Sequence, residues 1–317
     1  MINKININDY FEQGFLSPVK IIDQDEALNH RKKLEDAEKK LGPIHYKSKV
    51  HTVLKSAFDL ATNKNILDVV EKILGPNILL YNVTYIIKEP NSASHVSWHQ
   101  DMTYWGFSGD EQVSAWLALS EANDLSGAMK MIPGSHKMGK QQHEITDDKD
   151  NVLLQGQTVR NVNEEASVLC SLKPGQASFH HGWTLHTSMP NKSDDRRIGL
   201  NIQYIATHIK QLKNEKDTAI CVRGYDEFNH FLKEEPAKVE IDFDALERFT
   251  DTSGYNYFWH ETDKYTLTSK NYIWTFPGRP FCRKSVIVMP EWNDYDWDLL
   301  RATNCYGICT DYVEKLA

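Results

Sequence analysis

Two histidines and one aspartate have the spacing of a metal site. His99 and Asp101 stand two positions apart, and His186 lies much later in the chain. If residues 98–101 form a strand, the His99 and Asp101 side chains project to one face, because side chains alternate along a strand. A second histidine from a distant strand completes a two-histidine, one-carboxylate triad with three open coordination positions, which suits Fe(II). Zinc hydrolases use the same ligand types, so the ligands alone leave both metals open.

An arginine and a serine that follow His186 have the chemistry of a carboxylate-binding site. Arg197 lies eleven residues after His186, and an arginine fork binds a carboxylate through two charge-assisted hydrogen bonds. Ser188, on the same strand face as His186, can donate a further hydrogen bond to that carboxylate. An iron triad with a carboxylate clamp is the minimal set for an oxygenase that uses Fe(II), 2-oxoglutarate and O2. The alternative is a surface ion pair of Arg197 with Asp194 or Asp195.

Three other side chains near these candidates have residue types that could also take part in a site. His180 has the same strand parity as His186 and is an alternative distal ligand, but the distance in sequence from His186 to Arg197 favours His186. We expect His95 in a loop at the mouth of the barrel. We expect Lys88, which stands just before a proline turn, to be a solvated or ion-paired surface lysine.

Short strands must position these residues. Up to about Leu74 the pattern predicts helices with loops, at residues 23–41 and 65–74. The pattern then changes to short runs rich in β-branched and aromatic residues, separated by turn signals. These runs predict strands at residues 78–87, 113–119, 128–132, 166–171, 177–181 and 198–205. Many short strands with frequent turns indicate a sandwich or jelly-roll barrel behind an N-terminal helical layer.

The composition is that of an ordinary globular protein with an acidic surplus. Of 317 residues, 36 are basic and 44 are acidic, giving a net charge of −8. An acidic chain lacks the positive surface that binds nucleic acid or anionic membranes. No apolar stretch approaches the about 20 residues that span a bilayer, and the five cysteines are scattered without a disulfide pattern. We therefore expect a cytoplasmic protein with reduced thiols that binds neither nucleic acid nor membrane.

Four motifs in register resemble the phytanoyl-CoA dioxygenase (PhyH) family. They are Trp98-His-Gln-Asp-Met-Thr-Tyr-Trp105, Val113-Ser-Ala-Trp-Leu-Ala-Leu119, Gly127-Ala-Met-Lys-Met-Ile-Pro-Gly-Ser-His136, and a stretch from His186 to Leu200 that contains Pro190-Asn191 and Arg196-Arg197. Their order and approximate spacing agree with the family over roughly residues 9–249. The resemblance implies a mainly β fold with flanking helices, in which a double-stranded β-helix (a cupin-like jelly roll) follows the helical layer.

The resemblance also assigns roles to residues. It implies that His99, Asp101 and His186 are catalytic iron ligands. It implies that Arg197 and Ser188 bind the cosubstrate 2-oxoglutarate, with Asn82 and Trp116 lining the cosubstrate pocket; the positions are read from the matching motifs.

The reaction implied is hydrogen abstraction from a small polar substrate, such as an amino-acid-like molecule or natural-product intermediate. Hydroxylation, cyclisation or desaturation follows, with release of succinate and CO2. The acidic chain disfavours an acyl-CoA substrate. We expect a catalytic domain at residues 1–250, an aromatic-rich extension at residues 251–317 that packs on it, and a monomer or homodimer. A zinc hydrolase and a non-catalytic metal-binding jelly roll are the alternatives.

Overall fold

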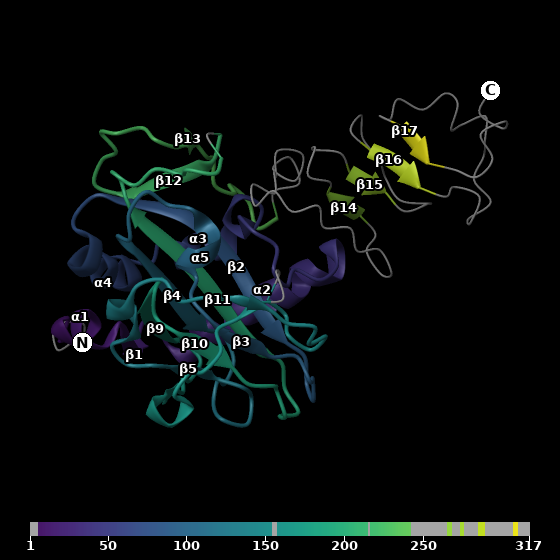
Figure 1. Ribbon diagram of the computed structural model, residues 1–317. Coiled ribbons are helices and arrows are strands. Elements are labelled where there is room, and N and C mark those ends of the chain that lie inside the picture. Colours follow the sequence, from purple (N-terminus) through teal and green to yellow (C-terminus); the bar gives the residue numbers. More distant parts are fainter. Residues whose placement is uncertain are drawn as a thin grey trace, which may run out of the picture.

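A computed structural model describes residues 6–153, 157–214 and 216–241, and the backbone of four short strands beyond them. Between residues 6 and 241 the chain forms a large and a small β-sheet, with helices against the large one (Figure 1). The prediction of a mainly β jelly roll with an N-terminal helical layer is confirmed.

The large sheet has seven strands in the order β1-β9-β4-β11-β2-β12-β13, antiparallel except for the last pair. Its centre is the long antiparallel pair of β2 and β11, flanked by β4. The strands span β1 (Phe15–Lys20), β2 (Ile78–Lys88), β4 (Gln112–Ala118), β9 (Gln176–His181), β11 (Arg197–Ala206), β12 (Thr218–Arg223) and β13 (Leu232–Lys233).

The small sheet has four antiparallel strands in the order β3-β10-β5-β8. They span β3 (Val96–His99), β5 (Met129–Met131), β8 (Val168–Cys170) and β10 (His186–Ser188). A two-stranded ribbon joins β6 (Glu144–Ile145) to β7 (Gln157–Thr158). Beyond residue 241, a further sheet pairs β14 (Tyr265–Leu267), β15 (Ile273–Thr275), β16 (Ser285–Val288) and β17 (Gly307–Cys309).

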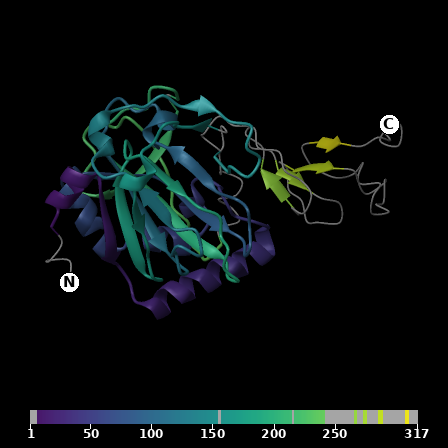
Figure 2. The same cartoon turned by 60° about the horizontal axis from the view of Figure 1, so that its bottom comes forward.

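Helices cover the outer face of the large sheet; Figure 2 shows α2, in purple, lying along it. The predicted helices correspond to α2 (Gln24–Leu41) and α4 (Lys64–Leu74). The helix α4 ends before Gly75-Pro76, where proline cannot continue a helix. The other α-helices are α1 (Asn8–Gln13), α3 (Lys55–Ala61) and α5 (Met102–Trp105), and 3-10 turns span Val50–Thr52, Ser135–Met138 and Glu164–Ala166.

Alternation along the central strands separates a structural face from a functional face. On β11, every second side chain packs with the helices in the main hydrophobic core, namely Ile198, Leu200, Ile202 and Tyr204. The side chains between them face the other way, because neighbours on a strand point to opposite sides. This inner face carries Arg197, Gly199, Asn201 and Gln203. The large sheet thus turns a polar face toward the small sheet.

Two predictions fall outside this description. The predicted boundary at residue 250 and the packing predicted for residues 251–317 lie outside the described residues, except for the backbone of β14–β17.

Among the described residues, every helix is too short or too polar to cross a membrane.

Candidate active site

Two histidines meet on neighbouring strands of the small sheet. His99 on β3 and His186 on β10 are register partners, and their ring centres lie 4.0 Å apart. The Nδ1–H group of His99 donates to the Ser97 carbonyl at 2.9 Å, and that of His186 donates to the Thr184 carbonyl at 2.9 Å. These hydrogen bonds fix both tautomers and leave each Nε2 lone pair free to bind a metal.

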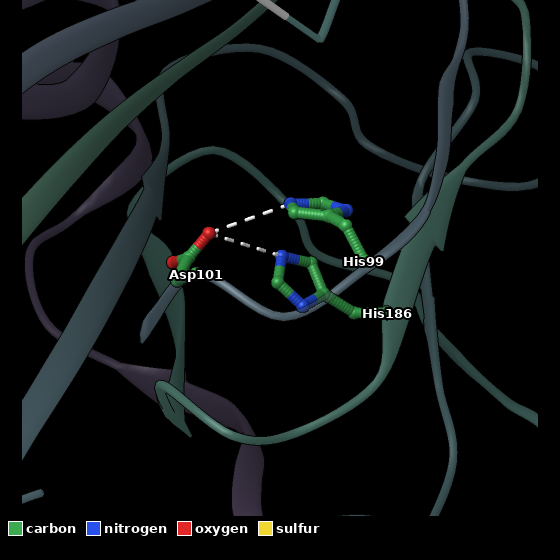
Figure 3. A group of neighbouring side chains, drawn as sticks. All are labelled: His99, Asp101 and His186. Atoms are coloured by element: carbon green, nitrogen blue, oxygen red, sulfur yellow. Dashed lines mark ion pairs between the residues drawn. The ribbon is translucent and has the colours of Figure 1, made fainter. Parts of the chain in front are cut away.

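Asp101 completes the group, although not from a strand as predicted. Strand β3 ends at His99, and Asp101 has helical backbone angles (φ −56°, ψ −43°) at the start of α5. Its Oδ1 lies 3.4 Å from His99 Nε2 and 3.7 Å from His186 Nε2 (Figure 3). The turn into the helix, and not strand alternation, therefore brings the carboxylate to the two imidazoles.

The three side chains fit a metal ion. Their ligand atoms all lie within 4.8 Å of one another, and both histidines are buried. Burial alone would raise the pKa of Asp101, but its contacts with His180 and His99 and the nearby His186 hold that pKa well below the usual value. Burial and neighbouring His99 lower the pKa of His186. An ionised carboxylate and neutral imidazoles are the forms that bind Fe(II) or Zn(II).

His180, the alternative distal ligand, lies beside the group. Its Nε2 is 3.5 Å from Asp101 Oδ2, on the far side of the carboxylate from the oxygen that faces the other two histidines. Ser114, its register partner on β4, donates to the same Oδ2 at 3.2 Å. Oδ1, which lies near His99 and His186, would be the oxygen that binds a metal, and Oδ2 is held by the large sheet. No spacing in the sequence distinguishes Ser114, so only the folded chain reveals this contact.

Arg197 is buried on the inner face of the large sheet, where β11 begins. It is 1% exposed, and its Nε and Nη2 atoms have no hydrogen-bond partner among the described residues. Its guanidinium carbon lies 5.1 Å from the centre of the Trp116 ring, a cation–π contact. Burial lowers the pKa of Arg197 to about 10, an effect that nearby Tyr46 partly opposes. An unpaired buried cation is costly, so the site is complete only with an anion.

The alternative of a surface ion pair for Arg197 is excluded by where its neighbours point. Asp195 accepts two hydrogen bonds from Arg31, each of 2.6 Å, and Asp194 accepts one from Asn91 at 3.3 Å. Arg196 pairs instead with Glu38 and Glu89 at the surface. Of the two adjacent arginines, only Arg197 faces the cavity.

Lys88 was wrongly expected at the surface. It is 2% exposed, stands opposite Arg197 across β2 and β11, and donates to Ser188 Oγ at 2.8 Å, to the Ser188 carbonyl at 3.0 Å and to the Met189 carbonyl. Burial, with the charge of Arg197, lowers the pKa of Lys88 to about 6. Strand parity could have found it, because Lys88 shares the inner face of β2 with Asn82.

Asn82 and Trp116 also lie on the inner face. The Asn82 side-chain oxygen accepts from the Lys49 backbone N–H at 2.7 Å, and its amide nitrogen donates to Thr84 Oγ1 at 3.2 Å. The Trp116 ring fits over Gly199, where an added Cβ would stand 1.9 Å from the ring. The glycine in this strand thus provides the space for the indole that supports Arg197.

All seven residues selected from the sequence line one cavity of about 300 Å³ between the sheets. The small sheet contributes His99, His186 and Ser188, and the large sheet contributes Asn82, Trp116 and Arg197, with Asp101 between them. One cavity therefore holds a metal-ligand group and an unpaired arginine.

The part of the chain that holds the candidate site matches a known protein family. The model of the phytanoyl-CoA dioxygenase (PhyH) family matches residues 18–199, more than half of the chain. The chain belongs to the PhyH family. The resemblance noted in the sequence is thereby confirmed, and the matched residues include both histidines, the aspartate and the arginine described above.

The similar curated proteins are named for different substrates. The chain is 30% identical over 158 residues to a probable alpha-ketoglutarate-dependent hypophosphite dioxygenase of Stutzerimonas stutzeri, covering 49% of this chain and 55% of that protein. It is 28% identical over 155 residues to the peroxisomal phytanoyl-CoA dioxygenase of Homo sapiens, covering 47% and 46%. The chain thus spans about half the length of these curated relatives.

A solved structure extends the likeness over more of the fold. The apo form of ThoJ, a non-heme monooxygenase, superposes with a TM-score of 0.68 at 28% identity, covering 76% of this chain and 92% of the ThoJ chain. The jelly roll as a whole, and not only the motif region, is therefore shared with a known non-heme protein.

Proposed function

We propose that the protein is an Fe(II)- and 2-oxoglutarate-dependent oxygenase that acts on a small polar molecule. The observation that carries this proposal is the pairing, in one cavity, of the His99–Asp101–His186 group with a buried arginine that has no anionic partner among the described residues. The metal ligands alone suit zinc equally well. Arg197 favours the oxygenase, because a buried arginine without an anionic partner among the described residues fits the far carboxylate of 2-oxoglutarate.

The chain's own residues have separate tasks in this proposal. His99 and His186 bind the metal through Nε2, and Asp101 binds it through Oδ1. Arg197 and Ser188 bind the far carboxylate of 2-oxoglutarate, while Trp116 supports the guanidinium from one side. Bound together, Fe(II) and 2-oxoglutarate supply the oxidation of a substrate C–H bond by O2, with loss of CO2 and formation of succinate.

Lys88 serves the clamp indirectly. Its Nζ atom donates to the Ser188 hydroxyl and to two backbone carbonyls beside it. This contact fixes the serine rotamer before the cosubstrate enters, which reduces the entropy lost on binding. Lys88 is therefore a positioning residue for Ser188 and adds positive charge beside Arg197 when it is protonated.

Substrate and outcome are part of the proposal. One relative is named for hypophosphite and another for phytanoyl-CoA, so family membership leaves the substrate open. The cavity of about 300 Å³ carries many amide, hydroxyl and ring groups, and it must also hold the cosubstrate. We propose a small polar substrate that undergoes hydroxylation, or cyclisation or desaturation where a second reactive group lies close.

The test is succinate formation from 2-oxoglutarate in air, with Fe(II) or Zn(II), across a panel of small polar molecules. We expect succinate with Fe(II) for at least one molecule, none with Zn(II), and none for His186→Ala. A His95→Ala variant, outside the metal group, should keep the activity. Turnover that persists in His186→Ala, or product formed with Zn(II) in the absence of O2, would contradict the proposal.

A further inference from the structure

A second cation faces the cavity from its rim. Lys213 lines the cavity, and its Nζ donates to the Tyr104 carbonyl at 2.9 Å. Among the described residues, no Asp or Glu carboxylate lies within 4 Å of this ammonium group. A lysine ammonium has three N–H donors, so Lys213 has further donors available for a ligand.

The rim segment that carries Lys213 is fixed by contacts with α5 and with the glycine that follows it. The Lys213 side chain lies across Gly106, where an added Cβ would stand 2.7 Å from its Cγ and Cδ atoms. Backbone N–H of Leu212 donates to the Gly106 carbonyl at 2.9 Å, and Gln211 Nε2 donates to the Trp105 carbonyl at 2.9 Å. The segment that follows β11 is thus fastened to α5, which begins at the metal-ligand aspartate. These contacts hold the backbone of the segment, and the Lys213 ammonium group is directed by its hydrogen bond to the Tyr104 carbonyl.

Lys213 and Arg197 lie at different ends of the cavity. Gln211 donates to the Tyr81 hydroxyl at 3.2 Å, and Tyr81 adjoins Asn82, the register partner of Gln203. Gln203 is six residues from Arg197 along β11, a separation of about 20 Å in a strand. The two residues thus belong to opposite ends of β11, which favours separate anionic groups for Arg197 and Lys213.

The charges that line the cavity leave Lys213 unbalanced. Among the described residues, the lining contains one carboxylate, Asp101, and three cations, namely Lys49, Arg197 and Lys213. Lys49 lies 3.4 Å from Glu234 and is balanced by it. In the proposed complex, Fe(II) and Arg197 together balance Asp101 and the two carboxylates of 2-oxoglutarate. One positive charge then remains, that of Lys213.

We propose that Lys213 binds a carboxylate of the substrate, so that the enzyme selects small molecules with a singly charged anionic group. This inference rests on the proposed function, because the charge balance assumes Fe(II) and 2-oxoglutarate in the cavity. A carboxylate carries one negative charge near pH 7, whereas a phosphate monoester carries about −1.5 to −2. A carboxylate therefore leaves the loaded cavity neutral, and a phosphate monoester does not.

The experiment compares small carboxylic acids with their own primary amides as ligands of the anaerobic protein loaded with Fe(II) and 2-oxoglutarate. Ligand-observed NMR gives the affinity of each compound, and saturating 2-oxoglutarate keeps Arg197 occupied. We expect acids to bind about tenfold more tightly than the matched amides, since hydrogen bonds between charged groups are the stronger ones. The preference should weaken in high salt, because Lys213 is at the exposed rim.

Three variants assign the preference to one side chain. Lys213→Met should bind acids and amides equally, and Lys213→Arg should restore much of the preference. Lys210→Met removes an exposed lysine of the same segment that does not line the cavity, and should leave the preference unchanged. A phosphate-monoester arm should bind no more tightly than the acids.

The outcomes separate this inference from the proposed function. Without the metal-to-ligand charge-transfer band expected of Fe(II) with 2-oxoglutarate, the proposed function itself fails. If the band forms, three results overturn the role of Lys213: equal binding of acids and amides, an unchanged preference in Lys213→Met, or no acid that binds at millimolar concentration. Tighter binding of phosphate monoesters than of acids would show that Lys213 prefers a doubly charged group, which contradicts the proposed carboxylate.

Discussion

The two walls of the cavity are built in different ways. The small-sheet wall presents the two candidate metal-ligand histidines from the ends of short strands, since β3 ends at His99 and β10 begins at His186. The large-sheet wall presents Arg197, which pairs with Lys88 where the long strands β11 and β2 begin their unbroken register up to Gln203 and Asn82. The metal group can therefore use a turn to aim its third ligand, while the anion clamp depends on strand alternation. Changes on the two walls should accordingly have separable effects.

The largest expected effect is on the small-sheet side, from Asp101→Ala. It removes one of three ligands and leaves two neutral imidazoles, so metal affinity should fall by more than 100-fold, since loss of even an outer partner costs about 10- to 100-fold. Equilibrium dialysis with Fe(II) or Co(II) measures this loss. Asp124→Ala, at an exposed site, is the control. Metal binding that survives in Asp101→Ala would remove this residue from the ligand set.

The next largest effect is on the large-sheet side, from Arg197→Met. We expect the Kd of 2-oxoglutarate to rise about 100-fold, because truncating one partner of a buried charge pair costs about 2–5 kcal/mol. The metal affinity should stay within a few-fold of that of the wild-type protein. Calorimetry with 2-oxoglutarate measures the first quantity, and Arg196→Met is the matched control at the surface. Equal losses in the two arginine variants would mean that the anion site lies elsewhere.

A smaller, pH-dependent effect is expected from Lys88. Its pKa of about 6 makes it mostly neutral at pH 8, and it gains a proton as the pH falls toward 6. The protonated form adds a cation beside Arg197, so 2-oxoglutarate should bind more tightly as the pH falls from 8 to 6. Lys88→Met should bind about tenfold more weakly at pH 6 and lose this trend, since a hydrogen bond to a charged group contributes about 1.5–3 kcal/mol.

Calorimetry in two buffers of different ionisation enthalpy gives an independent readout of the same residue. The unchanged protein should take up protons on binding 2-oxoglutarate near pH 7, and Lys88→Met should not. Lys88→Arg, which keeps a positive charge at every pH, should bind without the pH trend. Identical proton uptake in all three proteins would contradict the role of Lys88.

The smallest expected effect tests the packing behind the clamp. In Gly199→Ala the new methyl group would collide with the Trp116 ring. We expect a loss of about 1–3 kcal/mol in unfolding free energy, typical of overpacking, and a few-fold weaker binding of 2-oxoglutarate. Thermal unfolding and calorimetry measure the two changes. Gly109→Ala, where the added Cβ would meet the ends of two side chains, a Glu111 oxygen and Ile209 Cδ1, and not a ring, is the comparison. An unfolding free energy equal to that of the wild-type protein would show that the Trp116 ring shifts to make room for the methyl group.

The same difference between the walls explains what the sequence could predict. Alternation in residues 78–87 and 198–205 was readable because long strands keep one period over many residues, and the observed β2 and β11 extend these ranges by one or two residues. Asp101 was misplaced on a strand because no local pattern marks where a four-residue strand such as β3 ends. The side chain still reaches the two histidines, since the turn into α5 folds it back toward them.

Lys88 shows a second kind of limit. Its charge and the following proline turn indicated solvent, and the residues that bury it, Ser188 and Met189, lie a hundred positions away. The predicted strand ended at residue 87, so strand parity was not applied to Lys88. Lys213 lies beyond the family motifs, and its position depends on the contact with Gly106, which only the folded chain brings about.

The most direct test of the central claim is an anaerobic titration of the protein with Fe(II) and then 2-oxoglutarate, followed by visible absorption. Because one cavity holds both the metal group and the arginine clamp, we predict a metal-to-ligand charge-transfer band that needs both additions and saturates at one 2-oxoglutarate per chain. The band should be lost in Asp101→Ala and shifted to much higher 2-oxoglutarate concentration in Arg197→Met. A protein that binds Fe(II) but gives no band at any 2-oxoglutarate concentration would contradict the account.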